Sequence, residues 1–307
     1  MLPDVPADHE DMDNARLVHR GEFAEVDCPR AEDAGMSRQA KSIWLWSLAI
    51  SALVVLASVL GLTDPGMYDE ETANWAAQAR GQDMGNVVAV GVLLFSGHGY
   101  AKGSRGAAMV WLGTLLYFVY AYTVYSVAVH FNQLFLVYVA ALGLSAYAVM
   151  LSVNRLRAES EDLPQPQARR VVGCTSIAVG ALFGLLWLSE LVPASLSGKV
   201  PQSVVEAGLW VNPIHVMDLA IVLPALIIAG WQTLKGRAAG QFFVGPLLVF
   251  SVLMATSIVA AMALMVMEGL VDTLLPLLLV SLVAVASLFA AGRHLAPSDA
   301  PRVRRQA

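Results

Sequence analysis

Eight apolar runs, each long enough to cross a lipid bilayer as a helix, divide most of this 307-residue chain. A bilayer core about 30 Å thick needs about 20 mainly apolar residues in a helix, because each residue advances about 1.5 Å. The runs cover residues 43–63, 86–101, 107–129, 131–152, 171–192, 214–234, 241–266 and 270–292. Lipid offers no partner to free backbone N–H and C=O groups, so closed helices are expected. The predicted fold class is an all-α membrane protein with eight transmembrane helices.

The composition agrees with a chain that is mostly surrounded by a lipid bilayer, with 57% hydrophobic and 14% charged residues. The net charge of −5 arises in residues 1–42, which hold ten Asp or Glu and five Lys or Arg. The rest of the chain is charge-balanced, so no basic field is available to recruit nucleic acid. We expect 1–42 to be a disordered acidic tail that could bind a protein partner, because it has few apolar residues to bury.

The charges between the runs predict the orientation, because Lys and Arg accumulate in short cytoplasmic loops. Alternate connections carry the cations Arg38, Lys41, Lys102, Arg105, Arg155, Arg157, Arg169, Arg170, Lys235, Arg237, Arg293, Arg302, Arg304 and Arg305. The other connections carry mainly acids, namely Asp64, Asp69, Glu70, Glu71, Asp83, Glu206, Glu268 and Asp272, beside the cations Arg80 and Lys199. The pattern predicts a plasma-membrane protein with both termini in the cytoplasm.

Short matches between the two halves predict an internal duplication. SLAISAL from Ser47 is similar to SIAVGAL from Ser176, and GTLLYF from Gly113 is similar to GPLLVF from Gly245. The matches occur in the same order and at the same topological places. Four helices in each repeat give both copies the same orientation, as in the halves of some transporters. The alignment places Asn86 in the second run about where Asp218 lies in the sixth.

The predicted organisation therefore has five parts. They are an acidic tail at 1–42, a first four-helix repeat at 43–152, a cytoplasmic linker at 153–170, a second repeat at 171–292 and a basic cytoplasmic tail at 293–307.

The stretch WVNPIHVMDLAIVLP from Trp210 carries the strongest candidates for function, because ionisable residues within a membrane span are costly. Asn212 and Pro213 are a favourable helix cap and first residue, which places His215 and Asp218 within the first turns. Residues three apart on a helix share a face, so these two can meet directly or share a partner. They could clamp the sixth helix to a neighbour, or bind a proton, a ligand or a metal.

Topology brings further polar side chains to the same outer level, among them His130, Asn132 and Glu190. With His215 and Asp218, the residues His130 and Glu190 could form a zinc-type site of imidazoles and carboxylates, and His215, Asp218 and His130 are the metal candidates. No sequential metal motif supports this, and Glu190 could be charged only because it is solvated. No other cofactor is evident, since phosphate-binding and dinucleotide-binding motifs are missing.

Tyrosines deep in the third and fourth runs form another candidate set, namely Tyr117, Tyr120, Tyr122, Tyr125, Tyr138 and Tyr147. They are too deep to belong only to an interfacial belt. They could line a polar cavity or a headgroup pocket, with Tyr120 a candidate at the site. Hydrogen bonds to neighbouring helices explain them equally well.

Two segments resemble known sequences: LLYFVYAYTVYSVAVHFNQLFLVYVAALGLS from Leu115 and NPIHVMDLAIVLPALIIAG from Asn212. They are similar to a family of uncharacterised bacterial multi-span membrane proteins of unknown function. The resemblance implies a membrane location and no particular chemistry.

The sequence favours a transporter-like protein that handles a small molecule, ion or lipid at an outer polar site. One alternative is an intramembrane metal-dependent enzyme that acts on a lipid or lipid-linked substrate. Another is an accessory protein that binds a membrane partner. The pattern leaves open whether the chain is an enzyme and whether it forms oligomers.

Overall fold

A computed structural model describes residues 31–159, 166–270 and 274–296, and within these ranges it is built from helices without strands. Seven spans are single α-helices: α1 (Ala31–Thr63), α2 (Ala73–Ala101), α3 (Arg105–Ala128), α4 (Phe135–Glu159), α5 (Pro166–Ser197), α9 (Ala238–Met267) and α10 (Leu275–Leu295). The sixth span joins α7 (Pro213–Met217), the π-helical turn η2 (Asp218–Val222) and α8 (Leu223–Leu234). Two short helices, η1 (Pro65–Tyr68) and α6 (Gln202–Ala207), lie in connections. Among the described residues, eight helices are long and apolar enough to cross a membrane, as predicted.

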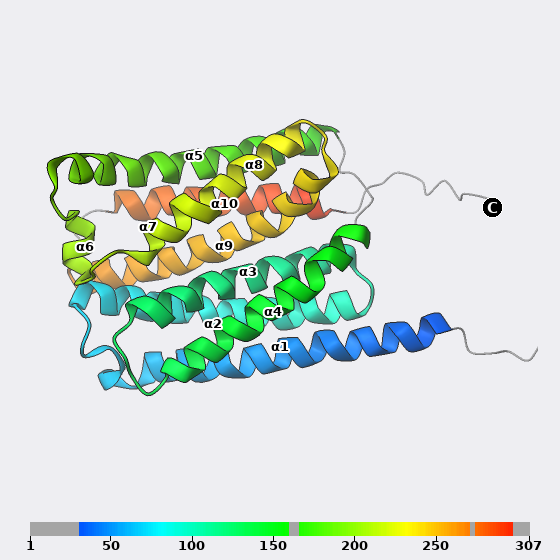
Figure 1. Ribbon diagram of the computed structural model, residues 1–307, viewed down its shortest axis with the longest axis horizontal. Helices are drawn as coiled ribbons and strands as arrows, with labels where there is room; N and C mark the ends of the chain where they lie inside the picture. Colours follow the sequence, from blue (N-terminus) through cyan, green and yellow to red (C-terminus); the bar gives the residue numbers. More distant parts are fainter. Residues whose placement is uncertain (1–30, 160–165, 271–273, 297–307) are drawn as a thin grey trace, which may run out of the picture. The chain divides into compact units, whose positions relative to one another are not determined.

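The chain divides into two units at Arg38, and the first unit is described only over the start of α1. Of the acidic tail at 1–42, for which the sequence predicts disorder, residues 1–30 lie outside the described residues, whereas residues 31–42 form the first part of α1. Residues 297–307 of the basic tail also lie outside the described residues. In the second unit, from Gln39 onward, α9 packs against α2, α3, α8 and α10. Figure 1 shows α9 between α8 and α3. This helix is therefore the centre of the bundle.

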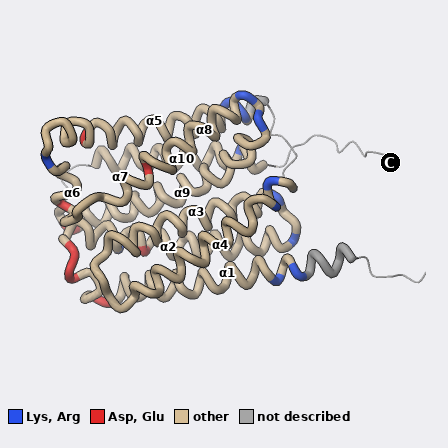
Figure 2. The backbone as a smooth tube through the Cα atoms, in the orientation of Figure 1, with Lys and Arg blue, Asp and Glu red and all other residues tan. Residues whose placement is uncertain are grey.

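Charges in the second unit separate towards the two ends of the helices (Figure 2). Lys102, Lys235 and Arg237 lie in or beside the links that join α2 to α3 and α8 to α9. Asp64, Asp69, Glu70 and Glu71 lie in the link from α1 to α2 at the other end. We call these the basic end and the acidic end.

The second span is longer than predicted, and this corrects the placement of one acidic residue. The sequence predicts a span over 86–101, whereas α2 begins at Ala73, so Asp83 lies inside the helix and not in a connection. Hydropathy misses this part because its polar residues lower the local average. Asp83 and Asn86 are both buried. Each accepts a hydrogen bond from a tyrosine hydroxyl, which takes the place of water in a segment surrounded by lipid.

The crossing of α2 with α9 is a close approach between the two halves. A Cβ atom built on Gly81 would lie 2.2 Å from the Cα of Ala261, and one built on Gly85 would lie 1.8 Å from Ser257 Oγ. Glycines four apart share one helix face, and small residues there let two membrane helices approach closely. Only glycine fits these two positions without separating the helices.

The sixth span starts as predicted but contains an irregular turn. The Asn212 side chain accepts a hydrogen bond of 2.9 Å from the Ile214 N–H, and Pro213 begins the helix. At η2 the Leu223 N–H bonds to the Asp218 carbonyl, five residues back. Pro224 follows, and its missing N–H and bulky ring explain why the regular ladder is interrupted here. The wide turn begins at Asp218.

We predict that Gly81→Ala lowers the free energy of unfolding by about 1–3 kcal/mol, because the new methyl group meets backbone atoms that cannot rotate away. Unfolding of purified protein by sodium dodecyl sulfate in mixed micelles measures the change. Gly91→Ala is the matched control in the same helix, since Gly91 is exposed and a Cβ there meets nothing within 4 Å. Equal losses in both variants would contradict the assignment of a tight crossing.

Candidate functional site

A cavity of about 570 Å³ lies among α2, α3, α5, the sixth span, α9 and α10. Most of its lining is apolar, and its polar members are Gln78, Gln82, Tyr120, Tyr125, Trp187, Ser203, Glu206, Asp218, Ser251 and Ser257 together with the indole of Trp75. Glu206 is exposed in α6 near the acidic end, so the cavity extends from the body of the helices to that end. The volume is in the range of small-molecule sites, about 300–1,000 Å³.

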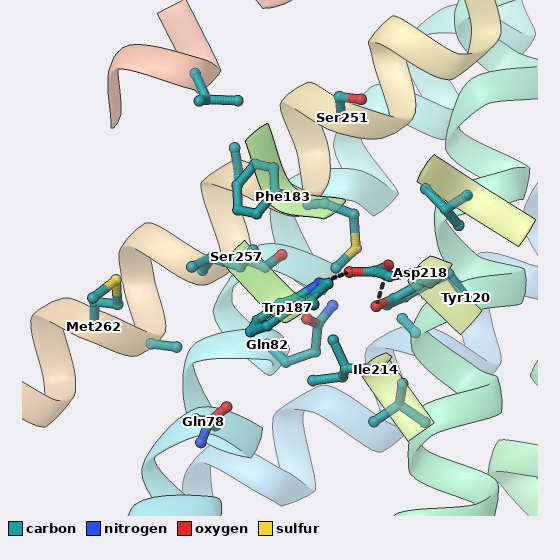
Figure 3. A pocket seen from close by; sticks show the side chains of 18 of the residues that line it. Gln78, Gln82, Tyr120, Phe183, Trp187, Ile214, Asp218, Ser251, Ser257 and Met262 are labelled. Atoms are coloured by element: carbon teal, nitrogen blue, oxygen red, sulfur yellow. Dashed lines mark hydrogen bonds between the residues drawn. The ribbon is translucent and has the colours of Figure 1, made fainter. Parts of the chain in front are cut away.

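Asp218 is the only carboxylate that both lines this cavity and belongs to a membrane-spanning helix among the described residues. The Tyr120 hydroxyl donates a hydrogen bond of 3.0 Å to its Oδ1, and the Trp187 indole N–H donates one of 2.8 Å to its Oδ2. Figure 3 shows both bonds converging on the carboxylate. The three side chains come from α3, α5 and the sixth span, and both donors are neutral. The carboxylate is therefore hydrogen-bonded without a cationic partner.

His215 lies beside the same tryptophan. The imidazole of His215 is buried and its ring centroid is 4.7 Å from that of Trp187. Its Nε2 is buried without a hydrogen-bond partner. His215 and Asp218, which are expected to share a helix face, therefore both contact Trp187. Sequence reasoning did not select this residue, although a tryptophan well inside a span and one turn before Glu190 was a usable signal.

The remaining polar candidates are held at the acidic end by other partners. His130 is exposed, its Nδ1 lies 3.0 Å from Glu71 Oε2, and its backbone N–H donates to Glu71 Oε1 at 2.7 Å. Asn132 Oδ1 accepts from the Leu134 N–H at the start of α4. Neither residue lines the cavity. The structure thus brings Tyr120 and Asp218 together in the cavity wall and places His215 against Trp187, outside the lining. His130 and Asn132 lie elsewhere.

Glu190 belongs to neither group, because it supports α6. Its Oε1 accepts a hydrogen bond of 3.0 Å from the Ser203 N–H in the first turn of that helix. Within the described ranges, no three His, Cys, Asp or Glu side chains come close enough to hold a metal ion together. The imidazoles and carboxylates considered as zinc ligands are not gathered in this arrangement.

Asp83 is a second buried carboxylate, which the sequence analysis placed in a connection. It is 1% exposed, and it accepts hydrogen bonds of 2.6 Å from the Tyr68 hydroxyl and 2.9 Å from the Tyr125 hydroxyl. Burial, and then the Asp83 carboxylate, raise the pKa of the Tyr68 phenol, so it remains a donor at neutral pH. A Cβ on Gly61 would lie 2.1 Å from Asp83 Oδ2, which shows how tightly α1 covers this group.

A third polar network joins α2, α3 and α9. Gln82 Nε2 donates to Tyr117 Oη at 2.7 Å, and the Tyr117 hydroxyl donates to Asn86 Oδ1 at 2.9 Å. The hydroxyls of Tyr117 and Ser257 are 2.7 Å apart. The tyrosines therefore divide into two sets. Tyr117 bonds neighbouring helices away from the cavity lining, while Tyr120 and Tyr125 line the cavity and also bond carboxylates.

Compared with protein-family models, curated proteins and solved structures, the chain gives no match. The chemistry available at the site follows from its geometry alone. The cavity offers an apolar volume and, from a membrane-spanning helix, the hydrogen-bonded carboxylate of Asp218, which can accept a proton, a hydrogen bond or a cation.

We predict that Asp83→Leu lowers the free energy of unfolding by about 1–3 kcal/mol, because the buried Tyr68 hydroxyl loses its acceptor and Tyr125 keeps only the Ala79 carbonyl. We expect Asp83→Asn to lower the free energy of unfolding much less. The amide oxygen can accept a hydrogen bond from Tyr68, and the amide N–H can donate to the Tyr125 oxygen. Tyr125 then donates to the Ala79 carbonyl, 2.9 Å away. Unfolding in mixed micelles compares the two. Equal destabilisation would show that the hydrogen bonds to Asp83 are not what stabilises this region.

Proposed function

We propose that this chain is a transporter-like membrane protein that handles a small molecule in the cavity beside Asp218. The observation that carries the proposal is a carboxylate without a cationic partner in the wall of a large cavity among membrane-spanning helices. Such a group is costly to keep in a membrane, and it commonly marks a substrate or ion path. The hydrogen-bonded neighbours hold the carboxylate in place, and the apolar wall suits a molecule that is itself mainly apolar.

We infer that the protein lies in the plasma membrane with both termini in the cytoplasm. The separation of charges supports this orientation, because the basic end holds the links from α2 to α3 and from α8 to α9. The first residues of the second unit, in α1, and the end of α10 lie at that same basic end. The acidic end then faces outward, and the cavity reaches the outer side near Glu206.

We infer also that the spans form two repeats of four helices. In support, Ser47 of α1 faces Gly97 of α2, where a built Cβ would lie 2.9 Å from the serine Oγ. Ser176 of α5 faces Gly230 of α8 in the same way, with a built Cβ 3.1 Å from the serine Cβ. The matched helices each carry a polar pair three residues apart, with Asp83 and Asn86 in one and His215 and Asp218 in the other.

A cysteine in the cavity tests the proposal. In a background with Cys28→Ser and Cys174→Ser, we expect Ser251→Cys to react with a membrane-impermeant charged methanethiosulfonate added to intact cells, because Ser251 lines the cavity. Ser287→Cys is the matched control, since both serines are buried but only Ser251 lines the cavity. Lys199→Cys, in the connection between α5 and α6, reports that the acidic end faces outward.

Labelling is detected by mass spectrometry of the purified protein. Failure of Ser251→Cys to react from either side of sealed vesicles, while the denatured variant reacts fully, contradicts a cavity that handles solutes. Reaction of Lys199→Cys only after permeabilisation contradicts the inferred orientation and leaves the cavity proposal standing.

A further inference from the structure

We infer that the ligand of the cavity is a lipophilic organic cation and that the Asp218 carboxylate is its counter-ion. The inference rests on the proposed function, and it adds the chemical class of the molecule. It follows from the charges, the rings and the volume of the cavity.

The charge of the lining is acidic and has no cationic counterpart. Asp218 and Glu206 line the cavity, and among the described residues no Lys, Arg or His belongs to the lining. The two groups bonded to Asp218, Tyr120 and Trp187, are neutral donors. A carboxylate in a low-dielectric environment gains most from a partner of opposite charge, and none of its observed partners is one. A cationic ligand supplies that charge, whereas an anionic ligand adds repulsion.

Two further ionisable groups lie near this site, namely the imidazole of His215 beside Trp187 and the carboxylate of Glu190, which acts on His215. An imidazolium has two N–H donors, and the Nε2 of His215 is buried without an acceptor. Charging His215 would therefore bury an unpaired N–H group. Glu190 is itself an acid and bonds the Ser203 N–H. Neither group provides the positive charge that Asp218 lacks.

The rest of the lining suits the body of such a cation. Six aromatic side chains contribute to it, namely Trp75, Tyr120, Tyr125, Phe183, Trp187 and Phe250. Aromatic faces attract cations, and this attraction strengthens where water is excluded. Methionine and aliphatic side chains complete the wall, among them Met254 and Met262. In Figure 3, Phe183 and Met262 lie along the cavity on the α5 and α9 sides of Asp218.

Three probes of similar shape and different charge test the inference. Tetraphenylphosphonium is a permanent cation, tetraphenylborate is an anion of nearly the same size, and triphenylphosphine oxide is a neutral relative. Equilibrium dialysis against the purified full chain in nanodiscs of uncharged lipid, with empty nanodiscs subtracted, measures saturable binding. We expect tetraphenylphosphonium to bind the wild type and tetraphenylborate not to bind.

Asp218→Asn is the informative variant, because the amide can accept from Trp187 and donate to the Tyr120 oxygen while it removes the charge. We expect it to weaken tetraphenylphosphonium binding at least about tenfold, the factor that corresponds to about 1.4 kcal/mol. Asp83→Asn is the matched control, since it removes a buried carboxylate that does not itself line the cavity, and its bonded neighbour in the lining, Tyr125, keeps the Ala79 carbonyl as acceptor. We expect Asp83→Asn to change the affinity for tetraphenylphosphonium by less than about twofold, because Asp83 and Asp218 share no hydrogen-bond partner.

The other outcomes separate this inference from the proposed function. If the neutral probe and the cation bind the wild type equally, and Asp218→Asn alters neither, the cationic class is wrong. The cavity function then still stands, provided that Ala255→Trp, which fills the cavity, abolishes binding of the neutral probe. If no probe binds saturably to folded wild type and Ser251→Cys is also unreactive, both the class and the function fail. Equal weakening by Asp83→Asn and Asp218→Asn overturns the role of Asp218 as counter-ion.

Discussion

The close crossing of α2 and α9 is the contact on which the rest of the arrangement depends. Gly81 and Gly85 bring the α2 backbone against Ala261 and Ser257, closer than any larger side chain permits. In lipid there is little hydrophobic force between helices, so close packing and hydrogen bonds hold such a crossing. Here the hydroxyls of Ser257 and Tyr117 lie 2.7 Å apart. The crossing also places Gln82 and Ser257 in the same cavity wall. A wider separation would disrupt both the network and the wall.

The two buried carboxylates have similar partners but different surroundings. Asp83 and Asp218 each accept hydrogen bonds from two neutral donors. Asp83 is enclosed by the tyrosines and by the α1 backbone at Gly61, so it fixes how α1, α2 and α3 pack. Asp218 lines the cavity, so its carboxylate is accessible from the cavity. The same chemical group therefore acts as a structural acceptor in one half and as the candidate ligand group in the other.

The irregular turn at η2 connects the fold to the site. Because η2 begins at Asp218, the backbone changes its winding where the carboxylate leaves the helix. Asp218 then joins the sixth span to α3 through Tyr120 and to α5 through Trp187. Any motion of α5 relative to α3 must stretch or exchange one of these bonds. Turns of this type are rare and often lie at functional sites. Asp218 therefore lies where an irregular turn, two neighbouring helices and the cavity meet.

The sequence alone determined the eight spans, the segregation of charge and the common face of His215 and Asp218, because hydropathy and helical periodicity are local properties. It did not determine where α2 starts, since Gln82, Asp83 and Asn86 lower the hydropathy of a segment whose partners lie on other helices. Only the tertiary structure selected Trp187 as the shared partner and paired His130 with Glu71. Those contacts depend on how segments distant in the sequence pack together, and the residue pattern of one helix does not indicate which helix it will pack against.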